Sequence, residues 1–200
     1  MQAIGTILNT GLNKILIGFG TSAVAVFGIY FRLQSFIFMP VFGLNSGMIP
    51  VIGYNYGAKR PKRIISAVKV GLIVSLSIMS AGFAIFTFLP HILLGWFNAT
   101  DEMMAIGVIA MQRISLCFIS AGFCIVLGAI FQGTGDGYIS MIISVTRQLI
   151  FLLPSAYLLG RFVGLDALWY SFIIAETSSL LLTIIFFRRV YVRKIKTLAA

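Results

Sequence analysis

Acidic residues are scarce in this chain. Only 5 of its 200 residues are aspartate or glutamate. All charged residues together make up 10% of the chain, whereas an average soluble domain is about a quarter charged. Hydrophobic residues make up 60%, and a chain of this length has too little interior to hide so much apolar surface from water. This composition excludes a soluble enzyme, a disordered tail and a secreted disulfide scaffold, and it predicts a protein that lies in lipid.

Residues that usually carry enzymatic or metal chemistry are also rare. There is one histidine and there are two cysteines, Cys117 and Cys124, seven positions apart in one apolar run. On a helix this spacing separates their Cα atoms by roughly 10 Å, beyond the reach of a disulfide. The glycine-rich stretch 133–137 lacks the lysine and the serine or threonine pair of a phosphate loop and is typical of a tight turn. We therefore expect no enzyme and no metal or other cofactor.

Long apolar runs, separated by glycine, proline or charged residues, make up nearly the whole chain. A spanning helix needs about 20 residues, so the chain has room for about six crossings. The runs predict helices at residues 2–19, 23–54, 61–90, 102–131, 138–159 and 166–190. The predicted fold is all-α: a polytopic membrane protein in which residues 1–200 form a single six-helix transmembrane bundle. Residues 191–200 are expected to form a basic cytoplasmic tail.

The basic residues predict how the bundle is oriented. The net charge of +10 could indicate nucleic acid as a partner, but most basic residues gather in two short clusters. These contain Lys59, Arg60, Lys62, Arg63, Arg188, Arg189, Arg193, Lys194 and Lys196. In a six-helix bundle both clusters fall on the same side, and loops rich in lysine and arginine face the cytoplasm. The pattern predicts a cell-membrane protein with both termini cytoplasmic and without a nucleic-acid partner.

Three prolines within the runs predict bent helices. Pro40 and Pro50 lie in the second run, which is too long for one straight crossing, and Pro154 lies in the fifth. Proline removes a backbone hydrogen bond and kinks a helix, and membrane proteins tolerate this where neighbours or water satisfy the freed groups. The second helix is therefore expected to be a moving part. The alternative is a long tilted helix with a passive kink.

Four ionisable residues are predicted to lie near the membrane midplane. A rise of about 1.5 Å per residue from the nearest helix end places Arg32, Arg113, Arg147 and Glu176 there. Such residues are costly in lipid and usually mark a pathway. Because the fifth and sixth runs are antiparallel neighbours, we expect Arg147 and Glu176 to form an ion pair. The remaining positive charge must be balanced by water, backbone carbonyls or a carboxylate from another polypeptide segment.

Amide side chains are further candidates for lining a cavity. Gln34 and Asn45 are eleven positions apart, which places them on one face of a helix, and Gln148 follows Arg147. The alternative for such residues is that they only hold neighbouring helices together through hydrogen bonds.

Several stretches resemble those of a known transporter family. FGIYFRLQ at residues 27–34 and GYNYGAKR at residues 53–60 resemble the eighth helix and following loop of multidrug and toxic compound extrusion (MATE) transporters. RQLIFLLP at residues 147–154 and GLDALW at residues 164–169 are similar to their eleventh and twelfth helices. The resemblance extends over essentially the whole chain, which would be the C-terminal six-helix lobe.

The resemblance implies a cation-coupled antiporter that exports organic cations by alternating access. Its partner would be an N-terminal six-helix lobe, covalently joined, present as a separate half, or replaced by a second copy of this chain. The family's seventh and tenth helices carry coupling carboxylates in some branches, and the matching runs here contain none. The coupling ion, H⁺ or Na⁺, is therefore expected in the N-terminal lobe. Two alternatives are half of a lipid-linked sugar flippase and a non-transporting, truncated membrane subunit.

Overall fold

The structure is a computed structural model that describes residues 2–199, and every regular element in that range is helical. The α-helices are α1 (Gln2–Leu16), α2 (Thr21–Gly57), α3 (Pro61–Phe88), α4 (Pro90–Gly95), α5 (Asp101–Ser115), α6 (Phe118–Gly133), α7 (Gly137–Val145), α8 (Leu153–Phe162), α9 (Leu165–Leu168) and α10 (Tyr170–Val190). Two π-helical segments, η2 (Thr146–Leu152) and η3 (Tyr191–Ile195), extend α7 and α10. Two 3₁₀ segments, η1 (Ile17–Phe19) and η4 (Lys196–Ala199), follow α1 and η3.

The helices are long and apolar enough to cross a membrane, which agrees with the predicted all-α membrane fold. Continuous helical stretches of spanning length run over Thr21–Gly57, Pro61–Phe88, Gly137–Phe162 and Leu165–Leu198. The pair α5 and α6, bent by 46°, would make a fifth if the two helices form one span. The first predicted segment, 2–19, is the exception, because α1 has only 15 residues and a crossing needs about 20.

The bend between α5 and α6 corrects the single helix predicted at residues 102–131. At the bend, the Cys117 amide donates to the Ile114 carbonyl three residues earlier, and the Ser115 hydroxyl donates to the Gln112 carbonyl. Serine hydroxyls that compete for helix carbonyls favour bends. The pattern of apolar residues continues across this point, so the sequence alone gave no boundary.

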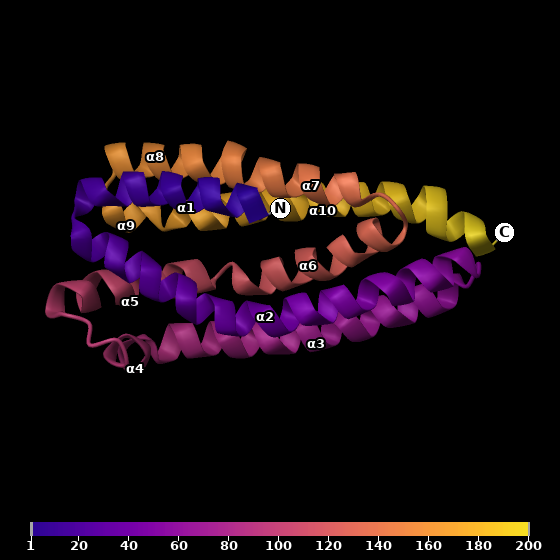
Figure 1. The fold of residues 1–200 in the computed structure, drawn as a ribbon, viewed down its shortest axis with the longest axis horizontal. Helices are drawn as coiled ribbons and strands as arrows, with labels where there is room; N and C mark the ends of the chain where they lie inside the picture. Colours follow the sequence, from indigo (N-terminus) through magenta and orange to yellow (C-terminus); the bar gives the residue numbers. More distant parts are fainter. Residues whose placement is uncertain (1, 200) are drawn as a thin grey trace.

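Prolines also divide two predicted segments. The helix predicted at 61–90 ends at Phe88, because the residue before a proline avoids the helical conformation, and Pro90 begins α4. In the segment predicted at 138–159, Pro154 has no amide to continue the α-helical ladder, and η2 ends two residues before it. The α-helix is thus interrupted beside Pro154, whereas α2 stays helical past Pro40 and Pro50 and curves visibly along its length (Figure 1).

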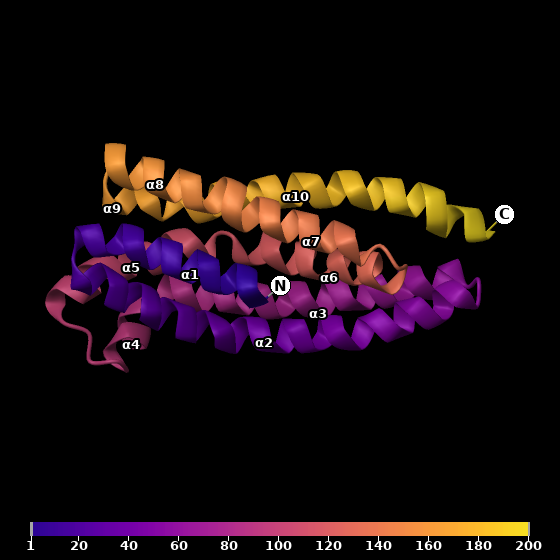
Figure 2. The same ribbon diagram turned by 45° about the horizontal axis from the view of Figure 1, so that its top comes forward.

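The bundle has two sides with α6 between them. In both views α7, α8 and α10 lie on one side and α2 and α3 on the other (Figures 1 and 2). The helices α2, α3 and α6 pack against one another, and α6 also contacts α10. Between α3 and α6 the backbones come close: a Cβ on Gly122 would lie 2.8 Å from Met79 Cγ and 2.9 Å from Ser75 Oγ. Glycine is therefore required there for the helices to touch.

The apolar core is divided into two clusters along the bundle. One contains buried residues such as Leu12, Tyr30 and Phe86. The other contains Ile52, Ile64 and Phe131 among others. On the segment α7–η2, Ile143 belongs to the second cluster and Leu152 to the first. The residues between these two positions therefore lie where the apolar core is interrupted.

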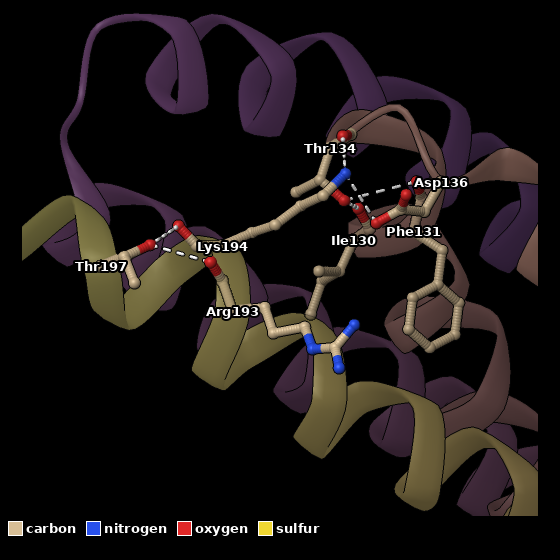
Figure 3. A network of polar contacts seen from close by, with 7 residues as sticks. All are labelled: Ile130, Phe131, Thr134, Asp136, Arg193, Lys194 and Thr197. Atoms are coloured by element: carbon tan, nitrogen blue, oxygen red, sulfur yellow. Dashed lines mark hydrogen bonds and ion pairs between the residues drawn. The ribbon is translucent and has the colours of Figure 1, made fainter.

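The turn between α6 and α7 is tight and is fastened to the C-terminal segment. Gly135 adopts a φ of 85°, and the Asp136 amide donates to the Phe131 carbonyl at 2.7 Å, which closes the end of α6. Lys194 Nζ lies 2.8 Å from Asp136 Oδ2 and donates to the Thr134 carbonyl at 3.1 Å (Figure 3). We call these contacts the Lys194–Asp136 clasp.

Residues 191–199, the described part of the predicted tail, do not form a separate tail. The helix of α10 continues as η3 and η4 to Ala199, the last residue described, and Ile195 is buried in the second apolar cluster. The α2–α3 turn lies at the same end of the bundle as this segment (Figure 1). Both basic clusters are therefore at one end, as their spacing predicted.

Candidate functional site

A cavity of about 400 Å³ lies beside the first apolar cluster, whose members Leu12, Tyr30 and Phe118 form part of its wall. Its wall is formed by α1, α2, the bend between α5 and α6, η2 and α10. The aromatic residues in the wall are Phe27, Tyr30, Phe31, Phe38, Phe42, Phe118 and Phe172, and the polar ones are Asn9, Tyr30, Gln34, Ser35, Cys117, Arg147, Gln148 and Glu176. A mostly apolar pocket of this size with a few convergent polar groups is typical of a small-molecule site.

An ion pair crosses one wall of this cavity. Arg147 Nη1 donates to Glu176 Oε2 at 3.1 Å, with the two side chains 31% and 9% exposed. The pair joins η2 to α10, which confirms the contact predicted from matching depths. The other carboxylate oxygen, Glu176 Oε1, is buried and has no hydrogen-bond partner. A buried acceptor without a partner is costly, so this oxygen is suited to accept a hydrogen bond from a ligand.

The aromatic wall is a connected set of rings. Tyr30 lies 6.3 Å from Phe172 and 6.0 Å from Phe86, centroid to centroid, and both pairs meet edge to face. Phe38 and Phe118 are 5.3 Å apart in the same arrangement. Such rings present apolar area together with electron-rich faces, which attract organic cations.

A second cavity, of about 210 Å³, meets the first at Arg147. It is lined by Phe42, Asn45, Cys124, Ile125, Gly128, Phe131, Gln132, Ser140, Ile143, Ser144, Arg147, Ser179 and Thr183. Four hydroxyl side chains and two amides make it more polar than the first cavity. Asn45 Oδ1 is buried without a hydrogen-bond partner. The two cavities share Phe42, Ile125 and Arg147, so Arg147 stands between an aromatic space and a hydroxyl-lined one.

Comparison with known proteins identifies the family. A model of the MatE family matches residues 1–158, which is more than three quarters of the chain. The chain belongs to the MatE family. It is 30% identical over 171 residues to the multidrug export protein MepA of Staphylococcus aureus, a match that covers 83% of this chain and 36% of MepA.

Solved structures of MATE transporters have the same fold as this MatE chain. A MATE transporter in the bent conformation superimposes with a TM-score of 0.89 at 22% identity, over 100% of this chain and 44% of that one. A MOP superfamily transporter from Pyrococcus furiosus, described as having a binding pocket of reverse polarity, gives 0.87 at 22% identity, again over 100% and 44%. This MatE chain thus spans less than half the length of these relatives.

The structure brings most of the predicted site residues of the MatE chain together. Gln34, Gln148 and Glu176 line the first cavity, Asn45 lines the second, and Arg147 lines both. The shared face predicted for Gln34 and Asn45 therefore points toward the two joined cavities. A role for these side chains in binding substrate stays a prediction.

Two predicted residues lie away from both cavities. Arg32 is exposed on α2. Arg113 donates to the Asp166 carbonyl at the start of α9, and its guanidinium lies 4.8 Å from the centre of the Tyr170 ring. The depth count predicted Arg113 near the midplane, whereas its side chain contacts the starts of α9 and α10, which the sequence pattern places at a helix end.

Several wall residues were not predicted from the sequence. Seven of them are aromatic, and aromatic side chains in lipid-facing and cavity-facing positions look alike in a sequence. Asn9 stands in an unusually polar first run, and Tyr30 lies within the stretch that resembles the family, so both carried a signal. Within the described residues, no three His, Cys, Asp or Glu side chains lie close enough to hold a metal ion.

Proposed function

We propose that this chain is the C-terminal lobe of a multidrug efflux transporter that exports organic cations by alternating access. The observation that carries the proposal is the aromatic cavity with one buried carboxylate, Glu176, in its wall. Aromatic faces suit lipophilic cations of different shapes, and the Glu176 carboxylate balances the charge of Arg147, so the wall adds no net positive charge. The similarity to multidrug export proteins supports the same substrate class.

The proposal includes a second lobe. The chain covers 36% of MepA and 44% of the similar solved structures, so an alternating cavity needs a further set of helices. Arg32, exposed on α2, lacks an acidic partner within the described residues and would face a carboxylate of that lobe. Export would be driven by H⁺ or Na⁺ entering in exchange for the cation. The end of the bundle that carries both basic clusters would face the cytoplasm of the cell.

The flippase alternative is less well supported. A pyrophosphate-linked sugar favours a cavity with surplus positive charge, yet Arg147, the one basic residue in the wall of either cavity, is neutralised by Glu176. The wall of the first cavity is also mainly apolar and includes six phenylalanine side chains.

An efflux measurement tests the proposal. Cells that lack their own exporters are loaded with ethidium and express this chain, an N-terminal MATE lobe, or both. We expect export only with both. Truncation of Phe38, a wall residue, to alanine should slow export several-fold through lost cation–π attraction, whereas Phe36→Ala, on the same helix but 74% exposed, should not. No export by the combined halves, although both are inserted in the membrane, would overturn the proposal.

A further inference from the structure

Acceptor oxygens without a partner belong to the walls of both cavities. Within the described residues, three side-chain atoms of the two walls are buried and make no hydrogen bond. They are Asn9 Oδ1 and Glu176 Oε1 in the first cavity and Asn45 Oδ1 in the second. All three are oxygens that accept hydrogen bonds, so a ligand that donates hydrogen bonds suits these walls.

Glu176 provides the strongest of these acceptors. The residue is 7% exposed, its Oε2 accepts from Arg147 at 3.1 Å, and its Oε1 is left without a donor. An ionised oxygen accepts a stronger hydrogen bond than a neutral one. Because a buried acceptor without a partner is unfavourable, a ligand that donates to this oxygen binds more tightly than one that cannot.

Amide side chains line the first cavity from three further elements. Asn9 stands on α1, Gln34 on α2 and Gln148 on η2. In the part of the chain that the structure describes, none of these three amides makes a side-chain hydrogen bond. An amide oxygen accepts two hydrogen bonds, so each of them can take an N–H donor from a ligand. Together with Glu176 on α10, four elements supply acceptors to one aromatic space.

Charge by itself does not distinguish one organic cation from another in this wall. Arg147 and Glu176 form an ion pair, so their charges cancel, and no other residue that lines either cavity carries a formal charge. The aromatic rings attract any lipophilic cation of suitable size through apolar area and cation–π contacts. What remains to separate cations of equal size and charge is whether they can donate hydrogen bonds to the wall oxygens.

We infer that the first cavity selects organic cations that carry N–H groups, such as amines, amidines and aminated aromatic dyes, over fully N-alkylated cations of the same shape. The inference rests on the proposed function as a cation exporter and narrows its substrate class. An N-alkylated cation fills the aromatic space but cannot donate, so the wall oxygens lose the bonds that water or an N–H group would give them. A site whose polar groups are left unpaired discriminates strongly against the ligand that lacks the matching donor.

Two fluorescent dyes that differ only in N-methylation test the selection. Rhodamine methyl ester with free amino groups, the amino dye, carries N–H donors. Tetramethylrhodamine methyl ester, the methylated dye, has the same ring system and charge with every N–H replaced by N–CH₃. Binding of each dye to the full chain in lipid nanodiscs is measured by fluorescence anisotropy, with the signal of empty nanodiscs subtracted. We expect the amino dye to bind at least tenfold more tightly, and equal dissociation constants would overturn the inference.

Replacement of Asn9 by leucine removes one acceptor and changes no charge. We expect Asn9→Leu to weaken binding of the amino dye several-fold and to leave binding of the methylated dye unchanged. The matched control is Asn13→Leu, four residues further along α1, because Asn13 is exposed and lines neither cavity. This control should keep the ratio of the two dissociation constants.

A double variant removes the carboxylate without leaving a charge unpaired. Arg147→Met combined with Glu176→Met replaces both members of the ion pair, and apolar replacement of a whole buried pair is often neutral for stability. The wall stays without net charge, so only its hydrogen-bonding capacity changes. We expect the preference for the amino dye to fall several-fold. If neither this double variant nor Asn9→Leu lowers the preference, the inference is wrong.

Export of the same two dyes separates this inference from the proposed function. Cells that express the chain together with an N-terminal MATE lobe are loaded with either dye, and the loss of cell fluorescence is followed. We expect faster export of the amino dye, with a smaller difference in Asn9→Leu. Equal export of both dyes would overturn the selection and leave the exporter intact. Export of neither dye, while the difference in binding persists, would instead overturn the proposed function.

Discussion

At the scale of single residues, one ion pair stands out in a chain with few charges. Arg147 and Glu176 face each other at 3.1 Å, in the interval between two apolar clusters. Each charge alone would be unfavourable there, because a buried ion without its partner keeps its desolvation cost and loses the attraction that offsets it. The pair therefore stabilises the packing of η2 against α10 only while both members are present.

Exchange of the two charges tests this contact. Arg147→Glu or Glu176→Arg alone should each lower the free energy of unfolding by about 3 kcal/mol, since each leaves two like charges together. The exchanged double variant should recover a large part of the loss. Thermal unfolding in detergent measures the three variants, with Glu102→Gln as the control. A double variant no more stable than the single ones would show that the pairing is wrong.

At the scale of elements, close backbone contacts hold the helices together. The helices are interrupted where side-chain hydroxyl groups compete for the backbone carbonyls of the helix, or where a proline lacks the amide. The α3–α6 contact depends on Gly122, whose carbonyl also accepts a hydrogen bond from Ser75 Oγ at 3.2 Å. The α5–α6 bend and η2 place Cys117 and Arg147 in the cavity wall. The two interruptions of regular α-helix, the α5–α6 bend and η2, thus shape the wall of the cavity.

Replacement of Gly122 by alanine should destabilise the protein. The added Cβ would lie under 3.0 Å from Met79 and Ser75, and overpacking of this kind costs about 1–3 kcal/mol. Gly28→Ala on α2 is the matched control, because a Cβ there meets nothing within 4 Å and alanine favours a helix. Unfolding midpoints of the two variants should move in opposite directions. Equal midpoints would mean that the α3–α6 contact is looser than described.

The Lys194–Asp136 clasp should hold the C-terminal segment in place. The two side chains are 32% and 13% exposed, so Lys194→Met should cost about 1 kcal/mol. Hydrogen exchange of the backbone amides over residues 191–198 should become faster, and Asp136→Asn should have much the same effect. Lys196→Met, two residues further along and exposed, is the control. If the hydrogen-exchange rates stay unchanged in both clasp variants, the apolar contacts alone hold this segment in place.

At the scale of the whole molecule, the basic clusters and the two cavities lie at different positions along the bundle. The basic clusters lie at one end, at the α2–α3 turn and along the C-terminal segment (Figure 1). The first cavity is lined by residues of the first apolar cluster, and the second cavity is lined by Phe131 and Ile143 of the second cluster. In the proposed orientation, the basic end would face the cytoplasm and the cavities would lie within the membrane.

Cysteine labelling tests the orientation. Cys117 and Cys124 are first replaced by alanine, and a single cysteine is introduced at Lys62 or at Asn98, which are both exposed. If the basic end faces inward, as we propose, a membrane-impermeant maleimide should label the variant Asn98→Cys in intact cells and not Lys62→Cys. Permeabilised cells should label both. The opposite labelling pattern in intact cells would show that the bundle has the reverse orientation in the membrane.

The sequence by itself determined that the protein lies in lipid and that its fold is all-α. It also determined that both basic clusters lie at one end and that Arg147 and Glu176 lie at matching depth. These follow from composition and from the rise per residue, which depend on local properties of the chain. Tertiary structure alone decided the rest: that Arg113 turns to Asp166 and away from the cavities, that the fourth run bends at Cys117, and that seven aromatic rings share one wall. The rotation of a helix about its axis, and the point at which it bends, depend on which neighbours pack against it. In a chain that is apolar on nearly every face, the pattern of hydrophobic residues carries almost no information about that choice.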